Sequence, residues 1–368
     1  MKIHILYDFV DGPYGGGNQF LKALRAEFQR TDVYTNEPDD ADIYLFNGNP
    51  IGNISRVDRL HNIRRRYPEK VYLFRLDGPT FLIRGWDKYQ DLLLKGICDT
   101  YMDGIVFQSK WCREKNRNLT GITARYETVI HNAPDQTIFN PKERGAFSPD
   151  RKIRIIATSW SSNIRKGFEV YRYLDDHLDW SRYDMTFVGN SPFGFKHIRW
   201  VKPQPSAELA QLLKQHDIYL TASRQDPCSN SLLEALSCGL PVLALNDGGH
   251  PELIGNGGVL FEKKDEVPEK LALLVESYEK FRRALPVPDL NAVARMYVDF
   301  AQAVKGKETG RTAMGKQDSS ALHSRYRKLR HYFLFHDFLM KVNRKLHRGA
   351  DGVLDRMRPG CLFSRRSA

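Results

Sequence analysis

The strongest constraint on the fold is a rhythm in which short apolar runs alternate with helical patterns through the first 305 residues. This rhythm is typical of βαβ units, in which a helix follows each strand of a parallel sheet. It stops once, in the stretch 131–151, which contains Pro134, Pro141, Gly145 and Pro149 and has no periodic pattern. The sequence therefore predicts two doubly wound α/β halves joined by a hinge, with a ligand-binding cleft at the carboxyl ends of their strands.

The same patterns predict where the elements lie. In the first half we expect strands at 3–7, 33–34, 43–46, 71–75, 104–107 and 127–130, and helices at 19–29, 89–98 and 110–118. In the second half we expect strands at 152–157, 185–188, 218–220 and 241–245. The helices there are expected at 167–177, at 206–215 with Ser206 as the N-cap, at 229–237, and as two more between 265 and 305.

Length and composition exclude several classes of protein. Of the 368 residues, 41% are hydrophobic and 27% are charged, as in ordinary globular domains. No run approaches the ~20 apolar residues of a membrane span, and the apolar run at the N-terminus is too short for a secretory signal. The five cysteines are scattered and form no C-x-x-C pair. We therefore expect a cytoplasmic protein without a disulfide framework or a structural zinc site.

The net charge of +12 belongs mostly to the end of the chain. Residues 306–368 hold 15 of the 56 Lys and Arg but only 5 of the 44 Asp and Glu, so the first 305 residues are nearly neutral. Within this tail, 321–348 predicts a helix that combines an apolar face with many basic residues. Such a helix suits peripheral binding to an anionic membrane surface, while packing on the body or on a partner is the alternative and nucleic-acid binding is not expected. The predicted apolar face consists of Leu322, Tyr326, Leu329, Phe333 and Met340.

The most informative stretch for function is 223–252. A loop carrying Asp226 leads into the expected helix, and Glu234 lies in the first turns of that helix. The free amides of Ser229, Asn230 and Ser231, at the positive end of the helix dipole, form an anion site. Two carboxylates beside an anion site suit a ligand that has both phosphates and sugar hydroxyls. The structural alternative is an ordinary loop aspartate and a solvated helix glutamate.

Asp226 and Glu234 are separated by seven residues, and the helix is followed by Cys-Gly-Leu-Pro-Val at 238–242 and by Gly-Gly-x-Pro-Glu at 248–252. This block resembles the E-x7-E region of the retaining glycosyltransferases of family 4, the glycosyl transferases group 1. Their GT-B fold has two Rossmann-like domains that face each other across a cleft. The resemblance covers about residues 1–305 and implies that Glu234 binds the nucleotide ribose and Asp226 the donor-sugar hydroxyls. The sequence departs from the family by having Asp226 where glutamate is usual.

Two further segments resemble the same family. Arg165-Lys166-Gly167 resembles the segment whose lysine neutralises the donor diphosphate, and such a charge would also stabilise the leaving group. Arg165 would replace an arginine that the family has slightly upstream. Gly16 and Gly17 belong to a glycine-rich loop resembling the loop that lies over the donor phosphates. A solvated lysine and a plain turn are the structural alternatives.

Three more residues are predicted to contact acceptor or donor. Arg75 and Asp77 follow an expected strand and should face the cleft, although they could instead form a structural ion pair. His250 follows two glycines. Its side chain is expected either to contact the phosphates or sugar or only to cap its own turn. A catalytic Cys228 is a weaker alternative: the nearby helix N-terminus would lower its thiol pKa, but no histidine partner accompanies it.

The acidic run at 37–42 is interpreted as a turn leading into a strand and not as a D-x-D segment that holds a metal–diphosphate. We therefore expect neither a metal nor another cofactor, with Lys166 and the helix N-terminus supplying the positive charge instead. The predicted organisation is an acceptor-side domain at 1–145, a donor domain at 146–305 and a basic tail at 306–368. As the resemblance implies, the expected activity is transfer of a hexose from a nucleotide-diphosphate donor to a glycan or glycolipid hydroxyl with retention. The alternatives are an inactive sugar-nucleotide or carbohydrate-binding protein and a nucleotide-sugar epimerase.

Overall fold

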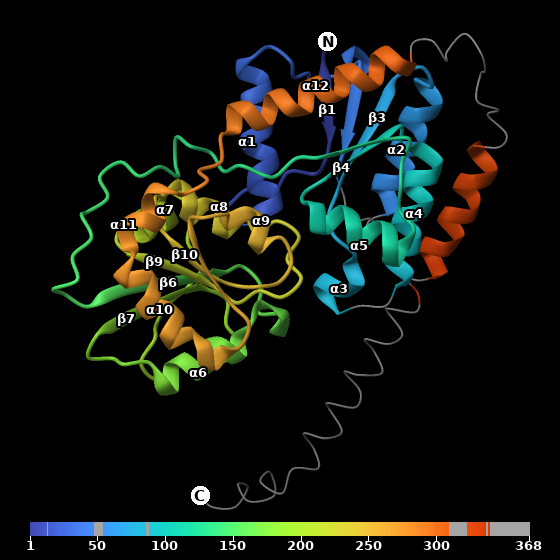
Figure 1. Ribbon diagram of the computed structural model, residues 1–368. Coiled ribbons are helices and arrows are strands. Elements are labelled where there is room, and N and C mark those ends of the chain that lie inside the picture. Colours follow the sequence, from blue (N-terminus) through green and yellow to red (C-terminus); the bar gives the residue numbers. More distant parts are fainter. Residues whose placement is uncertain (13, 48–53, 86–87, 309–321, 336–337, 339–368) are drawn as a thin grey trace, which may run out of the picture.

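The computed structural model describes residues 1–12, 14–47, 54–85, 88–308, 322–335 and 338. It contains a five-stranded and a six-stranded parallel sheet, and helices cover both faces of each (Figure 1). The prediction of two doubly wound α/β halves is therefore confirmed.

The first sheet has the strand order β1-β2-β3-β4-β5, and Tyr34 bridges the free edge of β1. Because side chains alternate along a strand, Ile43 and Leu45 pack in one apolar core while Tyr44 and Phe46 pack in the core of the opposite face. The strands are β1 (Ile3–Leu6), β2 (Ile43–Phe46), β3 (Val71–Leu76), β4 (Gly104–Phe107) and β5 (Tyr126–Val129). The helices are α1 (Gly16–Arg30), α2 (Ile54–Arg66), α3 (Thr80–Arg84), α4 (Tyr89–Tyr101) and α5 (Lys110–Thr120).

The second sheet has the order β11-β10-β9-β6-β7-β8, so the winding direction reverses between β6 and β9. The loops that follow these two strands therefore diverge and leave a crevice at their carboxyl ends. The strands are β6 (Ile153–Ser159), β7 (Tyr183–Gly189), β8 (Arg199–Val201), β9 (Ile218–Thr221), β10 (Val242–Leu245) and β11 (Gly258–Phe261). The helices are α6 (Phe168–His177), α7 (Ser206–Lys214), α8 (Asn230–Ser237), α9 (His250–Ile254), α10 (Val267–Glu276) and α11 (Tyr278–Arg283).

The last helix of the region predicted as the donor domain packs on the other half. Helix α12 (Leu290–Glu308) lies beside α1 and buries Leu290, Tyr297 and Val304 in the core of the first sheet (Figure 1). The predicted boundary at residue 305 therefore differs from the packing, in which the chain returns to the first half before α12. The helical periodicity of the sequence predicted this helix, but it could not predict which of the two sheets the helix covers.

The tail prediction is corrected in part. Residues 322–335 are helical, and the rest of the predicted helix, including Met340, lies largely outside the described residues. Leu322, Leu329 and Phe333 are buried against the first half, and Tyr326 stacks on His61 with the ring centroids 3.8 Å apart. The apolar face that we expected to contact a membrane therefore packs on the first half of the protein.

Three local expectations also differ from the structure. Helix α2 was not predicted, because its sequence is rich in arginine and only two of its buried residues, Val57 and Leu60, are apolar, while His61 and Arg64 are polar. The expected strand at 33–34 is a single bridge, and three helices rather than two lie between 265 and 308. Ser206 is the first residue of α7 rather than its cap, and Pro205 precedes it. In the part of the chain that the structure describes, none of the helices is both long and apolar enough to cross a membrane.

Candidate active site

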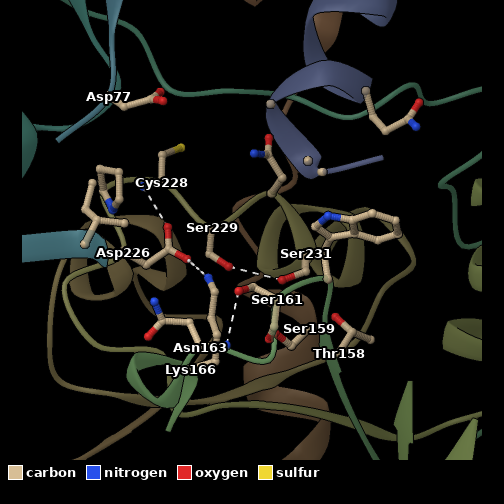
Figure 2. A pocket seen from close by; sticks show the side chains of 18 of the residues that line it. Asp77, Thr158, Ser159, Ser161, Asn163, Lys166, Asp226, Cys228, Ser229 and Ser231 are labelled. Atoms are coloured by element: carbon tan, nitrogen blue, oxygen red, sulfur yellow. Dashed lines mark hydrogen bonds and ion pairs between the residues drawn. The ribbon is translucent and has the colours of Figure 1, made fainter. Parts of the chain in front are cut away.

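A cavity of about 790 Å³ lies between the two halves (Figure 2). Its walls are formed by the loops after β1, β3, β6 and β9 and by the N-terminal half of α8. Parallel strands place these loops at the same end of each sheet, which is where open α/β sheets bind ligands. Of the twelve predicted site residues, all but His250 line this cavity: Gly16, Gly17, Arg75, Asp77, Arg165, Lys166, Asp226, Ser229, Asn230, Ser231 and Glu234.

Asp226 and Lys166 form an ion pair within the cavity wall. The Lys166 ammonium lies 3.0 Å from Asp226 Oδ2, and the side chains are 31% and 12% exposed, respectively. Burial is the largest single influence and would raise the pKa of Asp226, but the charges of Lys166 and His250 and the hydrogen bonds from Lys166 and the Cys228 amide together hold that pKa below its usual value. Asp226 is therefore ionised at neutral pH, and the ammonium group of Lys166 is partly open to the cavity.

The backbone around Lys166 requires a glycine at the next position. Gly167 has φ +77°, and a Cβ there would lie 2.1 Å from the carbonyl oxygen of Ala222, just after β9. This close approach brings the loop after β6 against the loop after β9. Arg224 N also donates to the Arg165 carbonyl at 2.7 Å. The Lys-Gly sequence is thus what places the ammonium beside Asp226.

Glu234 is a buried carboxyl group that faces the cavity. It is 8% exposed, and no described residue donates a hydrogen bond to its side chain. Burial raises its pKa to about 8, so the side chain is mostly protonated at neutral pH. A buried acid without a partner is destabilising, and it is the kind of group that a polar ligand completes.

Helix α8 begins at the floor of the cavity. Ser229 is its N-cap residue, and the Ser229 and Ser231 hydroxyls lie 3.2 Å apart. Ser231 also accepts a hydrogen bond of 2.9 Å from Tyr219, which contacts Thr158 at 3.0 Å. This chain of hydroxyls fixes the first turn of the helix, whose free amides favour an anion.

The first half closes directly over α8. A Cβ on Gly16 would lie 2.5 Å from Cβ of Asn230, so the glycine allows the N-termini of α1 and α8 to meet. Gly17 has open space around it and lines the cavity beside them. The glycine-rich loop therefore faces the predicted phosphate site from the opposite half.

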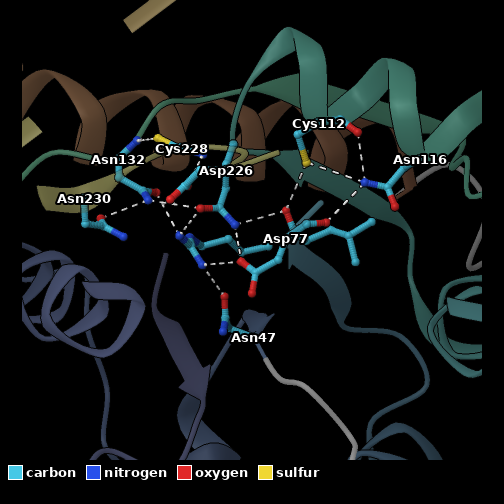
Figure 3. A network of polar contacts seen from close by, with 11 residues as sticks. Asn47, Asp77, Cys112, Asn116, Asn132, Asp226, Cys228 and Asn230 are labelled. Atoms are coloured by element: carbon cyan, nitrogen blue, oxygen red, sulfur yellow. Dashed lines mark hydrogen bonds and ion pairs between the residues drawn. The ribbon is translucent and has the colours of Figure 1, made fainter. Parts of the chain in front are cut away.

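Arg75 has a fully buried guanidinium group that joins the side chains of a polar network. Figure 3 labels Asn47, Asp77 and Asn132 of this network. Arg75 donates to the side-chain oxygens of Asn47 at 2.6 Å, Gln108 at 2.7 Å and Asn132 at 2.8 Å, and to Asp77 at 3.5 Å. Asn132 then donates to Asn230 at 3.1 Å, which connects the network to α8. Arg75 is thus a buried part of the cavity wall that holds its neighbours in place, whereas the Asp77 carboxylate is exposed at the cavity.

The remaining candidates have different surroundings. His250 is buried outside the cavity, and its Nδ1 lies 2.9 Å from the Leu245 carbonyl, as in the turn-capping alternative. Arg165 lines the cavity and donates to Gln225 at 2.9 Å. The weaker alternative of a catalytic Cys228 is not supported, because burial raises the pKa of its thiol to about 12.

Sequence reasoning missed several residues of this site. Tyr14 and Trp160 come from opposite halves, line the cavity and have ring centroids 6.1 Å apart. Asn190 and Gln204 also line the cavity. No spacing rule identifies these residues, because their position depends on how the halves pack. Among the described residues, no group of three or more His, Cys, Asp and Glu side chains could hold a metal ion.

Residues 194–285 match the family model described as glycosyl transferases group 1. Among curated proteins, the chain is 25% identical over 141 residues to a probable sucrose-phosphate synthase of Thermosipho melanesiensis, which covers 36% of this chain and 33% of that protein. It is 33% identical over 92 residues to spore coat protein SA of Bacillus subtilis, covering 23% and 24%, respectively. The matches span 24% to 48% of the length of the curated relatives.

Solved structures resemble the chain over most of its length. Anabaena HepE in complex with UDP and glucose has a TM-score of 0.60 at 15% identity and covers 84% of this chain and 99% of that chain. Sucrose-phosphate synthase from Thermosynechococcus elongatus has a TM-score of 0.61 at 12% identity, with 86% and 100% covered. These likenesses establish the fold. Residues 194–285 thus match the glycosyl transferases group 1 model, and the chain has the two-domain GT-B fold.

Proposed function

We propose that this protein is a glycosyltransferase that moves a hexose from a nucleotide-diphosphate donor to a hydroxyl of a glycan or glycolipid, with retention of configuration. The observation that carries the proposal is the convergence of Lys166, Asp226 and Glu234 with the start of α8 in one interdomain cavity. The group 1 segment contains Asp226, Glu234 and all of α8. HepE, a structural neighbour, binds UDP and glucose in its crystal structure.

Each residue has a role that matches its surroundings. The α8 amides and the Lys166 ammonium receive the diphosphate, Asp226 accepts hydrogen bonds from sugar hydroxyls, and Glu234 accepts them from the ribose. In the reaction the bond between C1 of the sugar and the diphosphate oxygen breaks, and the diphosphate leaves with the electron pair. The acceptor oxygen forms the new bond to C1 and gives its proton to the departing diphosphate oxygen. Positive charge near the leaving oxygens lowers the barrier to this step.

We further propose that the reaction needs no metal ion, because a lysine and a helix N-terminus supply the positive charge that a metal would otherwise give. The test is thermal unfolding of the protein with UDP-, GDP-, ADP- and dTDP-sugars, with EDTA and with Mg²⁺. A ligand at 100 times its dissociation constant adds about 2.7 kcal/mol to the free energy of unfolding. We expect one nucleotide class to give this shift equally in EDTA. A shift that requires Mg²⁺ would contradict the metal-free proposal, and no shift with any donor would contradict the activity.

We also propose that the protein binds peripherally to anionic membranes through helix 322–335. Its inner face is buried, but Tyr332, Leu334 and Phe335, in its last turn, are 46–57% exposed. The helix has four Arg and Lys residues and no Asp or Glu. Exposed aromatic groups next to basic residues suit binding at a membrane–water interface. There the anionic surface contributes about 1 kcal/mol of attraction for each Lys or Arg.

Vesicle co-sedimentation tests this binding. We expect the wild type to bind vesicles containing phosphatidylglycerol and to release them in high salt. The Arg327→Glu/Lys328→Glu variant should bind at least about tenfold more weakly, since each reversal removes one attraction and adds a repulsion. The matched control, Lys263→Glu/Lys264→Glu, changes two basic residues of the second half. Equal binding by both variants would contradict the proposal.

A further inference from the structure

One carboxylate of the second half caps a helix of the first half. Glu252 lies in α9, and its two oxygens accept hydrogen bonds of 3.0 Å each from the amides of Lys110 and Trp111. These amides belong to the first turn of α5, which otherwise has the Ser109 side chain as its cap, accepting from Cys112 N at 3.0 Å. Figure 1 shows α9 beside α5 where the halves meet.

The local electrostatics favour this arrangement. A carboxylate at a helix N-terminus satisfies amides that have no partner within the helix and interacts favourably with the helix dipole. His131, in the segment that joins the halves, lies 3.2 Å from the same carboxylate. Burial would raise the pKa of Glu252, but His131 and the two amides outweigh it and hold that pKa below its usual value. The cap is therefore ionised at neutral pH.

The cap is connected to the candidate active site by a short, rigid piece of chain. Gly249 N donates to the Asp226 carbonyl at 2.8 Å, and Glu252 lies three residues later in the same helix. A Cβ on Gly249 would lie 2.4 Å from the Pro227 carbonyl oxygen, so this turn packs tightly against the loop of Asp226. The position of α5 is thus tied to the loop that carries the sugar-binding carboxylate.

We propose that Glu252 is a positioning residue that fixes the two halves in the orientation the transfer reaction needs. Its polar partners among the described residues are Lys110, Trp111 and His131, none of which lines the cavity. It acts by holding α5, and with it the first half, against the Asp226 loop. The part of the inference that concerns transfer rests on the proposed function. The structural part, that this carboxylate sets the interdomain orientation, stands on its own.

Two variants remove the cap from opposite sides. Glu252→Ala removes the acceptor. Lys110→Pro removes one of its donors without touching Glu252, and proline is well suited to this site because Lys110 is the first residue of α5 and Ser109 is extended. Arg113→Ala, in the second turn of α5, is the control, because it leaves both capping amides in place. We expect each cap variant to lower the transfer rate by ~10- to 100-fold, because a hydrogen bond to a charged group is lost.

The readouts separate the possible failures. Small-angle scattering of the ligand-free chain should show a larger radius of gyration for both cap variants, and the thermal midpoint should stay near that of the Arg113→Ala control. The double variant should lose little more than Glu252→Ala alone. An unchanged radius of gyration in Glu252→Ala would overturn the positioning role, whatever the activity. A wild-type protein that transfers no sugar would instead contradict the proposed function and leave the scattering result intact.

Discussion

Replacing Glu234 by glutamine should abolish sugar transfer and at the same time stabilise the protein. Glutamine keeps the shape of the side chain, but unlike Glu234 it cannot lose a proton when the donor binds and so cannot become the carboxylate that accepts from the ribose hydroxyls. Each charge-assisted hydrogen bond contributes about 1.5–3 kcal/mol, so kcat/KM for the donor should fall at least ~100-fold. Stability should rise because the buried acid, whose pKa is about 8 in the folded protein, is removed.

The stability effect has a defined pH dependence. The pKa of Glu234 in the folded protein lies above the ordinary value of 4.5, so the folded state binds this proton more tightly than the unfolded state. The group's contribution to stability is therefore complete below about pH 4.5 and is lost as the pH rises through 8. The loss is on the order of 3–5 kcal/mol. Urea unfolding at pH 5, 7 and 9 should show the advantage of Glu234→Gln growing with pH.

The exposed Glu208 of α7 provides the matched control. Glu208→Gln should leave both transfer and the pH dependence of stability at wild-type values. If Glu234→Gln transferred sugar at the wild-type rate, the ribose role would be wrong. Parallel stability curves for wild type and Glu234→Gln would show that the buried acid does not titrate as its surroundings indicate.

Removing the Lys166 charge should have the second large effect. Lys166→Ala deletes the cation proposed to receive the diphosphate, so donor binding should weaken by about 1.5–3 kcal/mol, or roughly 10- to 100-fold. It also leaves Asp226 in its buried position without the partner that lowers its pKa. The pKa of Asp226 should then rise, and the acid limb of the pH–rate profile should move to higher pH.

A double-variant cycle separates these two consequences. Lys166→Met/Asp226→Asn removes both charges and should regain most of the stability lost in Lys166→Met, because the uncompensated buried charge is gone. It should regain no activity. Lys196→Ala, which breaks an exposed pair with Asp176, should change stability by less than about 1 kcal/mol. Recovery of transfer in the double variant would show that the pair serves only the fold.

The sequence predicted the positions of most strands because buried parallel strands have continuous apolar runs, as at Ile43–Phe46 and Gly104–Phe107. It also singled out the residues that line the cavity around α8, because helix starts and glycine turns have local signals. It could not predict that Glu234 is buried without a partner, or that Arg75 is a buried part of the cavity wall. Those properties arise from contacts between segments that are distant in the sequence. The same is true of Glu252, whose partners at 110 and 111 lie on the other half.

The return of α12 to the first half makes the first half incomplete without the end of the chain. A fragment containing residues 1–145 would expose the face of α1 and of the first sheet that Leu290, Tyr297 and Val304 cover. Such a surface of contiguous apolar groups leads to aggregation. The chain passes between the two halves twice, at 131–151 and just before α12. A protease that cuts one of these connections therefore leaves the halves covalently joined by the other. Expression of the halves as separate fragments should therefore succeed only if α12 is fused to the first.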